Sequence, residues 1–375
     1  MPNSPAVYHG DFTIFANAFH HFREPSFWSD QNSFNYPATT GLAIAFFYHF
    51  SHPALAYLVF LSVAIIAGAS LWAVRLKQRG LSAVAAALFV IAFVASYPFR
   101  FEVQRANIEG LVVVFTATAI LAFLRRRYWI FATLVGIAGA MKIFPIILLA
   151  LLFSTRRYKE MLWGVGVALI ANLCSLWVLG PGIMVANSNI AHGMKRFQQI
   201  YVDSGGRNLL VYDHSLFGLV KLPLLKFGGT STHHLVHVGS AIYLAAAALS
   251  GVILFFLVIR KLPLLNQILV LVLCAVSLPP ISFDYTLLHL AVPFALLSLY
   301  AMDVWNAGQT DFAVLNTVMV LFGVMFADLN LFGLHGQFMG PLRAIAIVAL
   351  LITFMRYPLH WHALQQPDYT QDSNS

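Results

Sequence analysis

Charged residues are scarce in this sequence: Asp, Glu, Lys and Arg make up 10% of its 375 residues, whereas 60% are hydrophobic. Soluble domains typically contain about 25% charged residues, so the composition excludes an ordinary soluble protein. No polar block is long enough to form a separate soluble domain. The sequence therefore predicts a polytopic membrane protein that is all-α, with helical spanning segments.

Cysteine is also scarce, and the common nucleotide-binding motifs are missing. Cys174 and Cys274 lie inside apolar runs, which indicates neither a disulfide framework nor a thiolate metal site. The sequence has no glycine-rich phosphate loop, no dinucleotide fingerprint and no Asp-x-Asp motif. His233 and His237 have the spacing of metal ligands on one helix face, but no carboxylate or cysteine close in the sequence completes such a site. We therefore expect no cofactor, no metal and no soluble nucleotide-sugar donor.

The excess positive charge, +8 at pH 7, is divided among short clusters between the apolar runs. A nucleic-acid-binding protein gathers such charge on one surface, so no nucleic-acid partner is expected. Clusters of this kind mark cytoplasmic loops by the positive-inside rule. They comprise Arg75, Lys77 and Arg79; Arg125, Arg126 and Arg127; Arg156, Arg157 and Lys159; and Arg260 with Lys261.

Lys142 interrupts an apolar run at residues 128–153, and Pro145 follows it. A lysine at the centre of a bilayer costs roughly 2.5–3.5 kcal/mol, so such residues usually face a protein interior or a wet cavity. Proline removes a backbone donor, so a straight helix through both residues is not expected. The stretch predicts two half-spans, 128–140 and 143–153, that meet at a break. A lysine that reaches back to the interface from a span end is the alternative.

Hydrophobic segments predict about eleven transmembrane helices within residues 37–357. Segment 37–50 is too short to cross roughly 30 Å of hydrocarbon and is predicted to be an interfacial helix. The predicted spans are 53–74, 81–97, 108–124, the two half-spans, 161–179, 235–259, 264–282, 285–302, 312–334 and 342–356. Residues 1–36 and 180–229 are predicted outer-face loops, the second with an interfacial helix at 209–226, and 358–375 a cytoplasmic tail.

The basic clusters determine the expected orientation. Counting spans from cluster to cluster keeps all of them cytoplasmic only if the Lys142 stretch crosses twice. The same count puts residues 1–36, 98–107, 180–229, 278–284 and 335–341 on the outer face. We therefore expect an integral protein of the bacterial inner (plasma) membrane whose site lies at the outer face.

Asp11 belongs to the outer face by this count, yet no apolar segment precedes it in the sequence. We therefore expect that an authentic first transmembrane helix is missing from this chain. Mass spectrometry of the native N-terminus tests this expectation, and a native start at Met1 contradicts it.

Polar residues of the expected outer loops provide the candidate site. Asp11 is a carboxylate beside apolar and aromatic residues at the interface, where burial suits it to act as a general base; a turn or a cap is the alternative. Arg105 and Asn107 lie in a loop between two spans. An arginine fork binds phosphate and an asparagine can hold sugar hydroxyls, with a salt-bridged loop and an Asn107 helix cap as the alternative.

The long outer loop carries basic residues against the positive-inside trend. Arg207 is therefore a candidate for binding an anionic headgroup or a phosphate, with Asp213 and His214 nearby in the sequence; packing is the alternative. Asp284, with His289 a turn later, follows two prolines at another outer corner. That corner is either a second wall of the site or a hairpin turn.

Several segments, taken in order, resemble glycosyltransferase family 87. They are Gly10-Asp11-Phe12 before Asn35-Tyr36-Pro37; Gln104-Arg105-x-Asn107; Gly139 to Pro145 with the later Arg156-Arg157-Tyr158; and Leu278-Pro279-Pro280-Ile281-Ser282-Phe283. The resemblance runs over about residues 10–293 and depends on the order of the segments. It implies a polyprenyl-phosphate-sugar-dependent membrane transferase of the C-type fold with an outward-facing cavity, similar to polyprenol-phosphate-mannose-dependent mannosyltransferases.

The resemblance also implies roles for single residues. Asp11 would be the catalytic base that takes the proton of an acceptor hydroxyl while the sugar is transferred with inversion. Arg105 and Lys142 would bind the donor phosphate, and Arg207 joins them as a phosphate ligand on its charge. The residues expected to contact the substrates are Tyr36, Asn107 and His214. The sequence departs from the family pattern in having no membrane helix before Asp11, and in having Pro279-Pro280 and Phe283 where the family has Ser-Pro and Trp.

The sequence thus predicts a membrane glycosyltransferase that transfers a monosaccharide, mannose in the first instance, from a polyprenyl-phosphate donor to a lipid or glycan acceptor. Its expected partners are that donor, that acceptor and membrane lipids. A secondary transporter with a broken-helix site at Lys142 is one alternative, although no second Lys-x-x-Pro occurs in the later half of the chain. A polymerase or ligase of lipid-linked glycans, with a diphosphate donor, is the other.

Overall fold

The computed structural model describes residues 12, 24, 35–180, 182–203, 210–227, 232–308, 313–329 and 338–361. Every regular element in these ranges is a helix, and one isolated antiparallel bridge pairs Asp213 with Phe283. The all-α prediction is therefore confirmed for the described part of the chain. Most of the predicted loop 1–36 and residues 362–375 of the predicted tail lie outside it.

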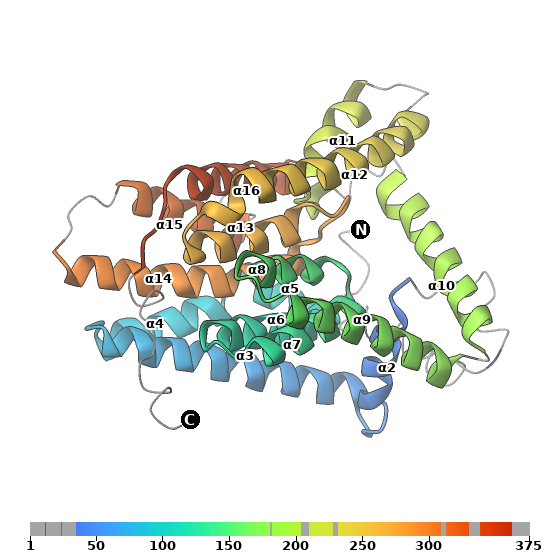
Figure 1. The fold of residues 1–375 in the computed structure, drawn as a ribbon, viewed down its shortest axis with the longest axis horizontal. Helices are drawn as coiled ribbons and strands as arrows, with labels where there is room; N and C mark the ends of the chain where they lie inside the picture. The colour runs from blue at the N-terminus through green and yellow to red at the C-terminus, as the bar shows by residue number, and fades with distance from the viewer. Residues whose placement is uncertain are drawn as a thin grey trace.

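Figure 1 shows the helices coloured in chain order. The first group comprises α2 (Ala38–Phe47), α3 (Pro53–Gln78), α4 (Ala83–Val94), α5 (Tyr97–Arg105), α6 (Glu109–Leu124), α7 (Tyr128–Met141), the 3₁₀ helix η2 (Phe144–Leu149), α8 (Ala150–Ser154) and α9 (Tyr158–Leu179). The second comprises α10 (Ile183–Phe197), the π-helix η3 (Gln198–Asp203), α11 (Leu216–Phe227), α12 (Thr232–Leu257), the 3₁₀ helix η6 (Ile259–Lys261), α13 (Leu264–Ser277), the 3₁₀ helix η7 (Asp284–Leu290), α14 (Ala291–Asn306), α15 (Ala313–Phe326) and α16 (Met339–Arg356).

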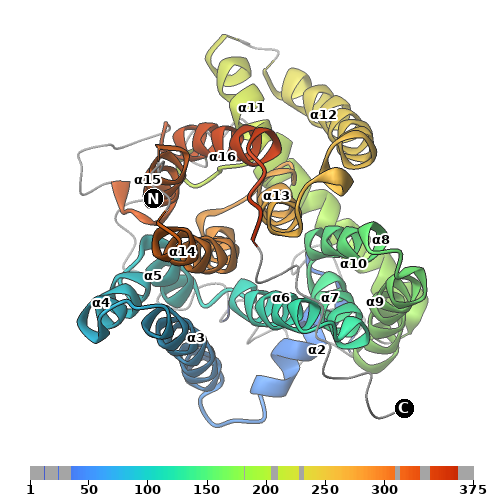
Figure 2. The ribbon, with the colours of Figure 1, turned by 60° about the vertical axis from the view of Figure 1, so that its left-hand side comes forward.

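Helices of the first and second halves of the chain form two sides of one bundle. In Figure 2, α3, α6, α7 and α9 lie on one side, and α11, α12, α13, α15 and α16 lie on the other. One apolar core joins α6, α7 and α8 to α13–α16, and a second joins α2, α3, α6, α7 and α9. Because α6 and α7 contribute to both cores, they are held from both sides.

Fewer helices than predicted have the length and composition to cross a membrane. Five qualify among the described residues: α3, α9, α16, the segment His233–Lys261 and the segment Asp284–Asn306. A sixth is formed if α4 and α5, bent by 44°, count as one span. Six further apolar helices in these ranges have 10–17 residues. The membrane character is thus supported, but the predicted count of about eleven is not confirmed.

The predicted break at Lys142 is confirmed. Helix α7 ends at Met141, Lys142 has an extended backbone (φ −143°, ψ 132°), and η2 begins at Phe144 with Pro145 in its first turn. A helix end leaves carbonyl groups without intrahelical partners. Thr40 of α2 supplies one such partner, because its Oγ1 donates to the Met141 carbonyl at 2.6 Å. A side chain of the neighbouring helix α2 therefore satisfies a carbonyl group at the end of α7.

Two glycines allow α7 and α9 to lie in close contact. A Cβ atom added to Gly136 would lie 2.5 Å from the carbonyl oxygen of Gly164, and one added to Gly164 would lie 2.9 Å from the carbonyl oxygen of Ala132. Small residues at helix crossings are the usual device for close packing inside membranes. This contact holds α7, and with it the break at Lys142, against a long predicted span.

The four basic clusters gather at one end of the bundle. Arg79 pairs with Asp303, which also accepts a hydrogen bond from Trp361. Close to Trp361 in the sequence, the Leu359 backbone donates to Asn266, and the neighbouring Gln267 donates to the Arg260 carbonyl of the last cluster. The ring contact between Phe256 and Phe153 leads to the third cluster, where Arg157 lies over the ring of Tyr128, next to the second cluster. One shared end is what the positive-inside prediction requires. Lys142 and Glu109 lie at the opposite ends of α7 and α6, which by helical rise is about 20 Å away.

Candidate functional site

Lys142 lies at the centre of a cluster of polar and aromatic groups. Its Nζ is 2.5 Å from Oε2 of Glu109 and 3.2 Å from Oδ1 of Asn107. The ring centroids of Tyr285 and Tyr36 lie 4.8 Å and 5.4 Å from the same nitrogen. The Lys142 side chain is 13% exposed. A carboxylate, an amide oxygen and two ring faces therefore stabilise a mostly buried cation. We call these five residues the Lys142 cluster.

The turn between α5 and α6 positions Asn107. The preceding residue, Ala106, adopts the left-handed region (φ 47°) although it is buried and is not a glycine. Such residues are uncommon and often occur at functional sites. Asn107 Oδ1 accepts the backbone N–H of Glu109 at 3.0 Å, and Asn107 Nδ2 donates to the Tyr36 hydroxyl at 3.3 Å. The Tyr57 hydroxyl donates to the Asn107 carbonyl. Asn107 thus both caps α6 and reaches Lys142.

Glu109 extends the Lys142 cluster toward η7. Its Oε1 lies 2.5 Å from Nε2 of His289, and the other imidazole nitrogen lies 3.1 Å from Oγ1 of Thr116. The ring of Phe144, in the first turn of η2, packs edge-on against His289 at 5.3 Å. The Glu109 side chain has no exposed surface and that of His289 is 5% exposed. A buried carboxylate is therefore shared by a lysine and a histidine.

A second buried cluster contains His214. His214 Nδ1 lies 3.4 Å from Asp284 Oδ1, and Arg343 Nη1 lies 2.7 Å from the same oxygen. The Tyr97 hydroxyl donates to Asp284 Oδ2 at 2.7 Å. His214 Nε2 lies 3.0 Å from the Thr286 hydroxyl. His214, Asp284 and Arg343 are fully buried, so this network ties α5, η7 and α16 together just before Tyr285.

Of the predicted site residues that the structure describes, three lie together and two, Arg105 and His214, lie outside their cluster. Lys142, Asn107 and Tyr36 lie in one cluster. Arg105 is exposed in the last turn of α5, two positions before Asn107. His214 lies in the second cluster, where Asp284 lies beside it and Tyr285 connects the two clusters along the chain. Asp11 and Arg207 lie outside the described residues, so their roles stay predictions.

Sequence reasoning gave no role to Glu109, and it named His289 only as part of a corner that is either a second wall of the site or a hairpin turn. Glu109 lies within the predicted span 108–124 and was given no role there, whereas it is the fully buried first residue of α6 and contacts Lys142. The sequence did contain an indication of its role, because a carboxylate at the start of a long apolar run in a membrane protein needs a partner of opposite charge or a hydrogen-bond donor. His289 lies 180 residues from Glu109, so no local pattern connects the two.

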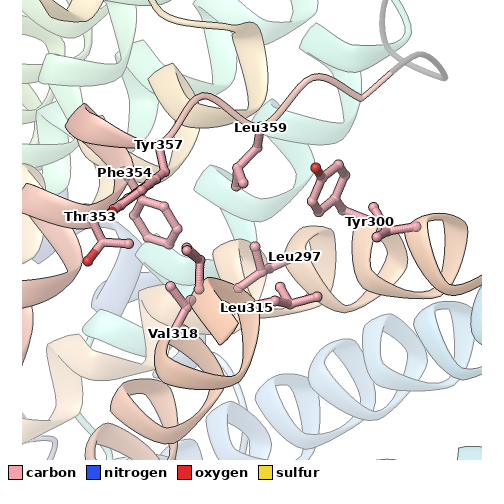
Figure 3. A pocket seen from close by; sticks show the side chains of 10 residues that line it. Leu297, Tyr300, Leu315, Val318, Thr353, Phe354, Tyr357 and Leu359 are labelled. Atoms are coloured by element: carbon pink, nitrogen blue, oxygen red, sulfur yellow. The ribbon is translucent and has the colours of Figure 1, made fainter. Parts of the chain in front are cut away.

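No metal site is formed by His, Cys, Asp and Glu side chains within the described ranges. His237 instead pairs with Asp203 at 2.8 Å, and His233 and His234 are exposed. The described residues line a small cavity beside His289 and a larger one far from the Lys142 cluster. One of about 10 Å³ beside His289 and Phe144 has room for about one water. The other, about 90 Å³, is lined mainly by apolar side chains of α14, α15 and α16 such as Leu297 and Phe354 (Figure 3). The predicted outward-facing cavity at the site is therefore not confirmed.

Comparison with known protein families gives a match over most of the chain. The sequence model of glycosyltransferase family 87 matches residues 34–279, well over half of the chain. The matched range contains Tyr36, Asn107, Glu109 and Lys142, together with the break between α7 and η2. No curated protein and no solved structure matches the chain.

Proposed function

The chain belongs to glycosyltransferase family 87, and on that premise we propose that it takes a monosaccharide, mannose as the first candidate, from a polyprenyl-phosphate donor. The acceptor in this proposal is a lipid or a glycan. Family membership and the apolar helices together make the chain a membrane glycosyltransferase. The donor, the sugar, the acceptor and the residue roles below are the proposal.

One observation supports the proposal most: the helix break presents the Lys142 cation beside Asn107 and Tyr36 at the end of the bundle opposite the basic clusters. Sugar transfer from a phosphate-linked donor leaves an additional negative charge on the departing phosphate. A fixed cation in a mostly water-excluded place stabilises such developing charge. Lys142 is such a cation, and Asn107 and Tyr36 offer hydrogen-bonding groups within the same cluster.

Asp11 is the proposed general base. In this mechanism its carboxylate removes the proton of an acceptor hydroxyl as the hydroxyl oxygen attacks the anomeric carbon. The bond from that carbon to the phosphate oxygen breaks on the opposite face, so the configuration inverts. The proton stays on Asp11 until solvent removes it, and the phosphate leaves with the electron pair of the broken bond. The support for Asp11 is its place in the segment that resembles the family.

The remaining roles follow the sequence prediction. Arg105, exposed and close in the chain to Asn107, is proposed to join Lys142 in binding the donor phosphate. Arg207 has the same proposed role on the strength of its charge. Asn107, Tyr36 and His214 are proposed substrate-binding residues. Because His214 is fully buried in this structure, its contact requires that η7 or its neighbours move on binding.

The proposed location is the bacterial plasma membrane with the site at the outer face. Its support is the separation of the Lys142 cluster from the basic clusters, which by charge belong at the cytoplasmic side. A secondary transporter also uses broken helices, but membership of a glycosyltransferase family favours the enzyme. A glycan polymerase or ligase would use a lipid-linked diphosphate donor, so an assay with both donors distinguishes that alternative from the proposal.

The proposal is tested by sugar transfer in membranes that contain the protein. Labelled polyprenyl-phosphate-mannose, a mannosyl polyprenyl diphosphate and a soluble nucleotide-linked mannose are supplied separately. We expect product only from the monophosphate donor, and we expect Asp11→Asn at matched expression to abolish it. Asp328→Asn, which changes the partner of the exposed Arg100, serves as the control carboxylate variant and should retain transfer. Transfer from the soluble donor contradicts the proposed reaction, and full activity of Asp11→Asn contradicts the proposed base.

A further inference from the structure

Glu109 uses its two carboxylate oxygens for two different partners. Oε2 lies 2.5 Å from the Lys142 ammonium, and Oε1 lies 2.5 Å from Nε2 of the His289 imidazole. Glu109 is fully buried and His289 nearly so. The carboxylate therefore connects the proposed phosphate-binding cation to the one type of side chain whose charge ordinarily changes near neutral pH.

The charges of this trio balance only while no anion is bound. Lys142 and Glu109 neutralise each other, and a neutral His289 adds nothing. A phosphodiester donor brings one more negative charge to Lys142, so that two anions face one cation in a mostly dry place, where like charges repel strongly. A proton on His289 restores the balance, because Nε2 of its ring already contacts the second oxygen of Glu109.

We propose that donor binding at Lys142 is coupled to the uptake of one proton by His289. The proton comes from solvent and adds to the imidazole, so that Glu109 pairs with the imidazolium and the Lys142 ammonium pairs with the phosphate. When the site empties, the proton returns to solvent and Glu109 pairs again with Lys142. His289 is thus a positioning residue that acts on Lys142 through Glu109. This inference rests on the proposed function, because it requires an anionic donor at Lys142.

Glu109 is the charged side chain that contacts the His289 ring directly. The other ring nitrogen faces the Thr116 hydroxyl, which does not change charge, and the ring packs on Phe144. The titratable and charged groups on the elements packed around η7 are Glu109 of α6; Tyr97, Arg100, Glu102 and Arg105 of α5; Cys274 of α13; Tyr300 and Asp303 of α14; Lys142 at the break; and Asp284 and Tyr285 of η7 itself. Of these, Asp284 is balanced by Arg343, and Asp303 pairs with Arg79 at the far end of α14.

The test is calorimetry of donor binding by the full chain in lipid nanodiscs. The probe is a mannosyl farnesyl phosphodiester without acceptor, because its phosphate has no proton that titrates near neutral pH. Binding heats in two buffers of different ionisation enthalpy give the number of protons taken up. We expect about one proton for each probe bound, with Kd rising up to about tenfold per pH unit in the range of uptake. His289→Gln should take up none and show a flat Kd, whereas His237→Gln, an exposed histidine, should behave like the wild type.

Glu109→Gln gives a second and opposite readout. It removes the charge that competes for Lys142, so we expect about tenfold tighter binding of the probe with no pH dependence. A purely structural role for Glu109 predicts weaker binding instead. The inference is overturned if the wild type binds the probe without taking up a proton, if His289→Gln still takes one up, or if Glu109→Gln weakens binding. Absence of any probe binding by the folded wild type overturns the proposed donor site as well, so the two failures are distinguishable.

Discussion

Lys142 and Glu109 form a buried ion pair between residues 33 positions apart, with Nζ 2.5 Å from Oε2. The lysine follows the last residue of α7, and the glutamate is the first residue of α6. Because the two helices are held by both apolar cores, the pair is fixed in place rather than formed by flexible side chains. A preorganised cation of this kind is what a departing phosphate requires.

Loss of Lys142 should destabilise the protein through Glu109. Lys142→Met leaves a buried carboxylate without its ammonium partner, and breaking a buried pair in this way costs about 3–5 kcal/mol. Adding Glu109→Gln removes the stranded charge, so the double variant should be more stable than Lys142→Met alone. Thermal unfolding in detergent measures both. A double variant whose loss equals the sum of the two single losses contradicts the pairing.

Arg343 should contribute strongly to the stability of the fold, although it lies in a mostly apolar helix. Its guanidinium pairs with Asp284 and lies over the ring of Tyr97, and the side chain is fully buried. We expect Arg343→Met to cost about 3–5 kcal/mol, because the fully buried Asp284 would lose its guanidinium partner. Arg100→Met, which breaks a pair with a half-exposed arginine, should cost less than about 1 kcal/mol. Equal shifts in Tm for the two variants contradict this difference.

Gly136 and Gly166 provide a matched pair of glycine variants. A methyl group at position 136 meets the Gly164 carbonyl oxygen at 2.5 Å, so Gly136→Ala must push α7 away from α9. Overpacking of this kind costs about 1–3 kcal/mol. Gly166 has nothing within 4 Å of the added atom, so Gly166→Ala should be neutral or slightly stabilising. The Tm of each variant is compared with that of the wild type in the same detergent. Equal Tm values for the two variants contradict close packing at Gly136.

Asp213 should make stability depend on pH. Burial raises the pKa of Asp213 above its ordinary value, although backbone N–H groups of Ser282 and Ser215, each 3.0 Å away, oppose the shift. A carboxyl whose pKa is raised by folding contributes most stability below its unfolded pKa of about 3.9, and this contribution is lost as pH rises through the folded pKa. Asp213→Asn carries no charge at any pH, so its Tm advantage over the wild type should grow as pH rises. A constant difference between the two Tm values contradicts the shift.

The orientation can be tested with single cysteines in a background that lacks Cys174 and Cys274. Lys159→Cys lies among the basic clusters, and Met184→Cys lies on exposed α10, in the predicted outer loop. A maleimide that cannot cross membranes should label the second variant in intact cells and the first only after the membrane is opened. The reverse labelling pattern places the basic clusters outside and contradicts the proposed location.

Local chemistry in the sequence predicted the break but not the full partner set of its lysine. A lysine followed by Pro145 inside an apolar run requires an interruption, and α7 does end at Met141. Asn107 and Tyr36 were named as site residues from their types and their segments. Glu109 and His289 were not, because their contact joins residues 180 positions apart and depends on how η7 packs against α6.

The length of an apolar run predicted the ends of helices less well than the prolines and charged residues within it. The predicted span 264–282 is a helix only to Ser277, because Leu278 is followed by two prolines that cannot continue it. Similarly, the predicted span 312–334 contains α15, which ends at Phe326. Both helices are therefore shorter than the predicted spans, and the predicted number of spanning helices is not confirmed within the described residues.

The most direct test of the account is the position of the donor phosphate. A cryo-electron microscopy structure of the full chain in nanodiscs, with the mannosyl farnesyl phosphodiester bound and no acceptor, shows that position. The account predicts phosphate density within hydrogen-bonding distance, about 3 Å, of the Lys142 ammonium and beside Asn107. Phosphate bound elsewhere, for example at the arginines between α6 and α7, while Lys142 remains paired only with Glu109, contradicts it.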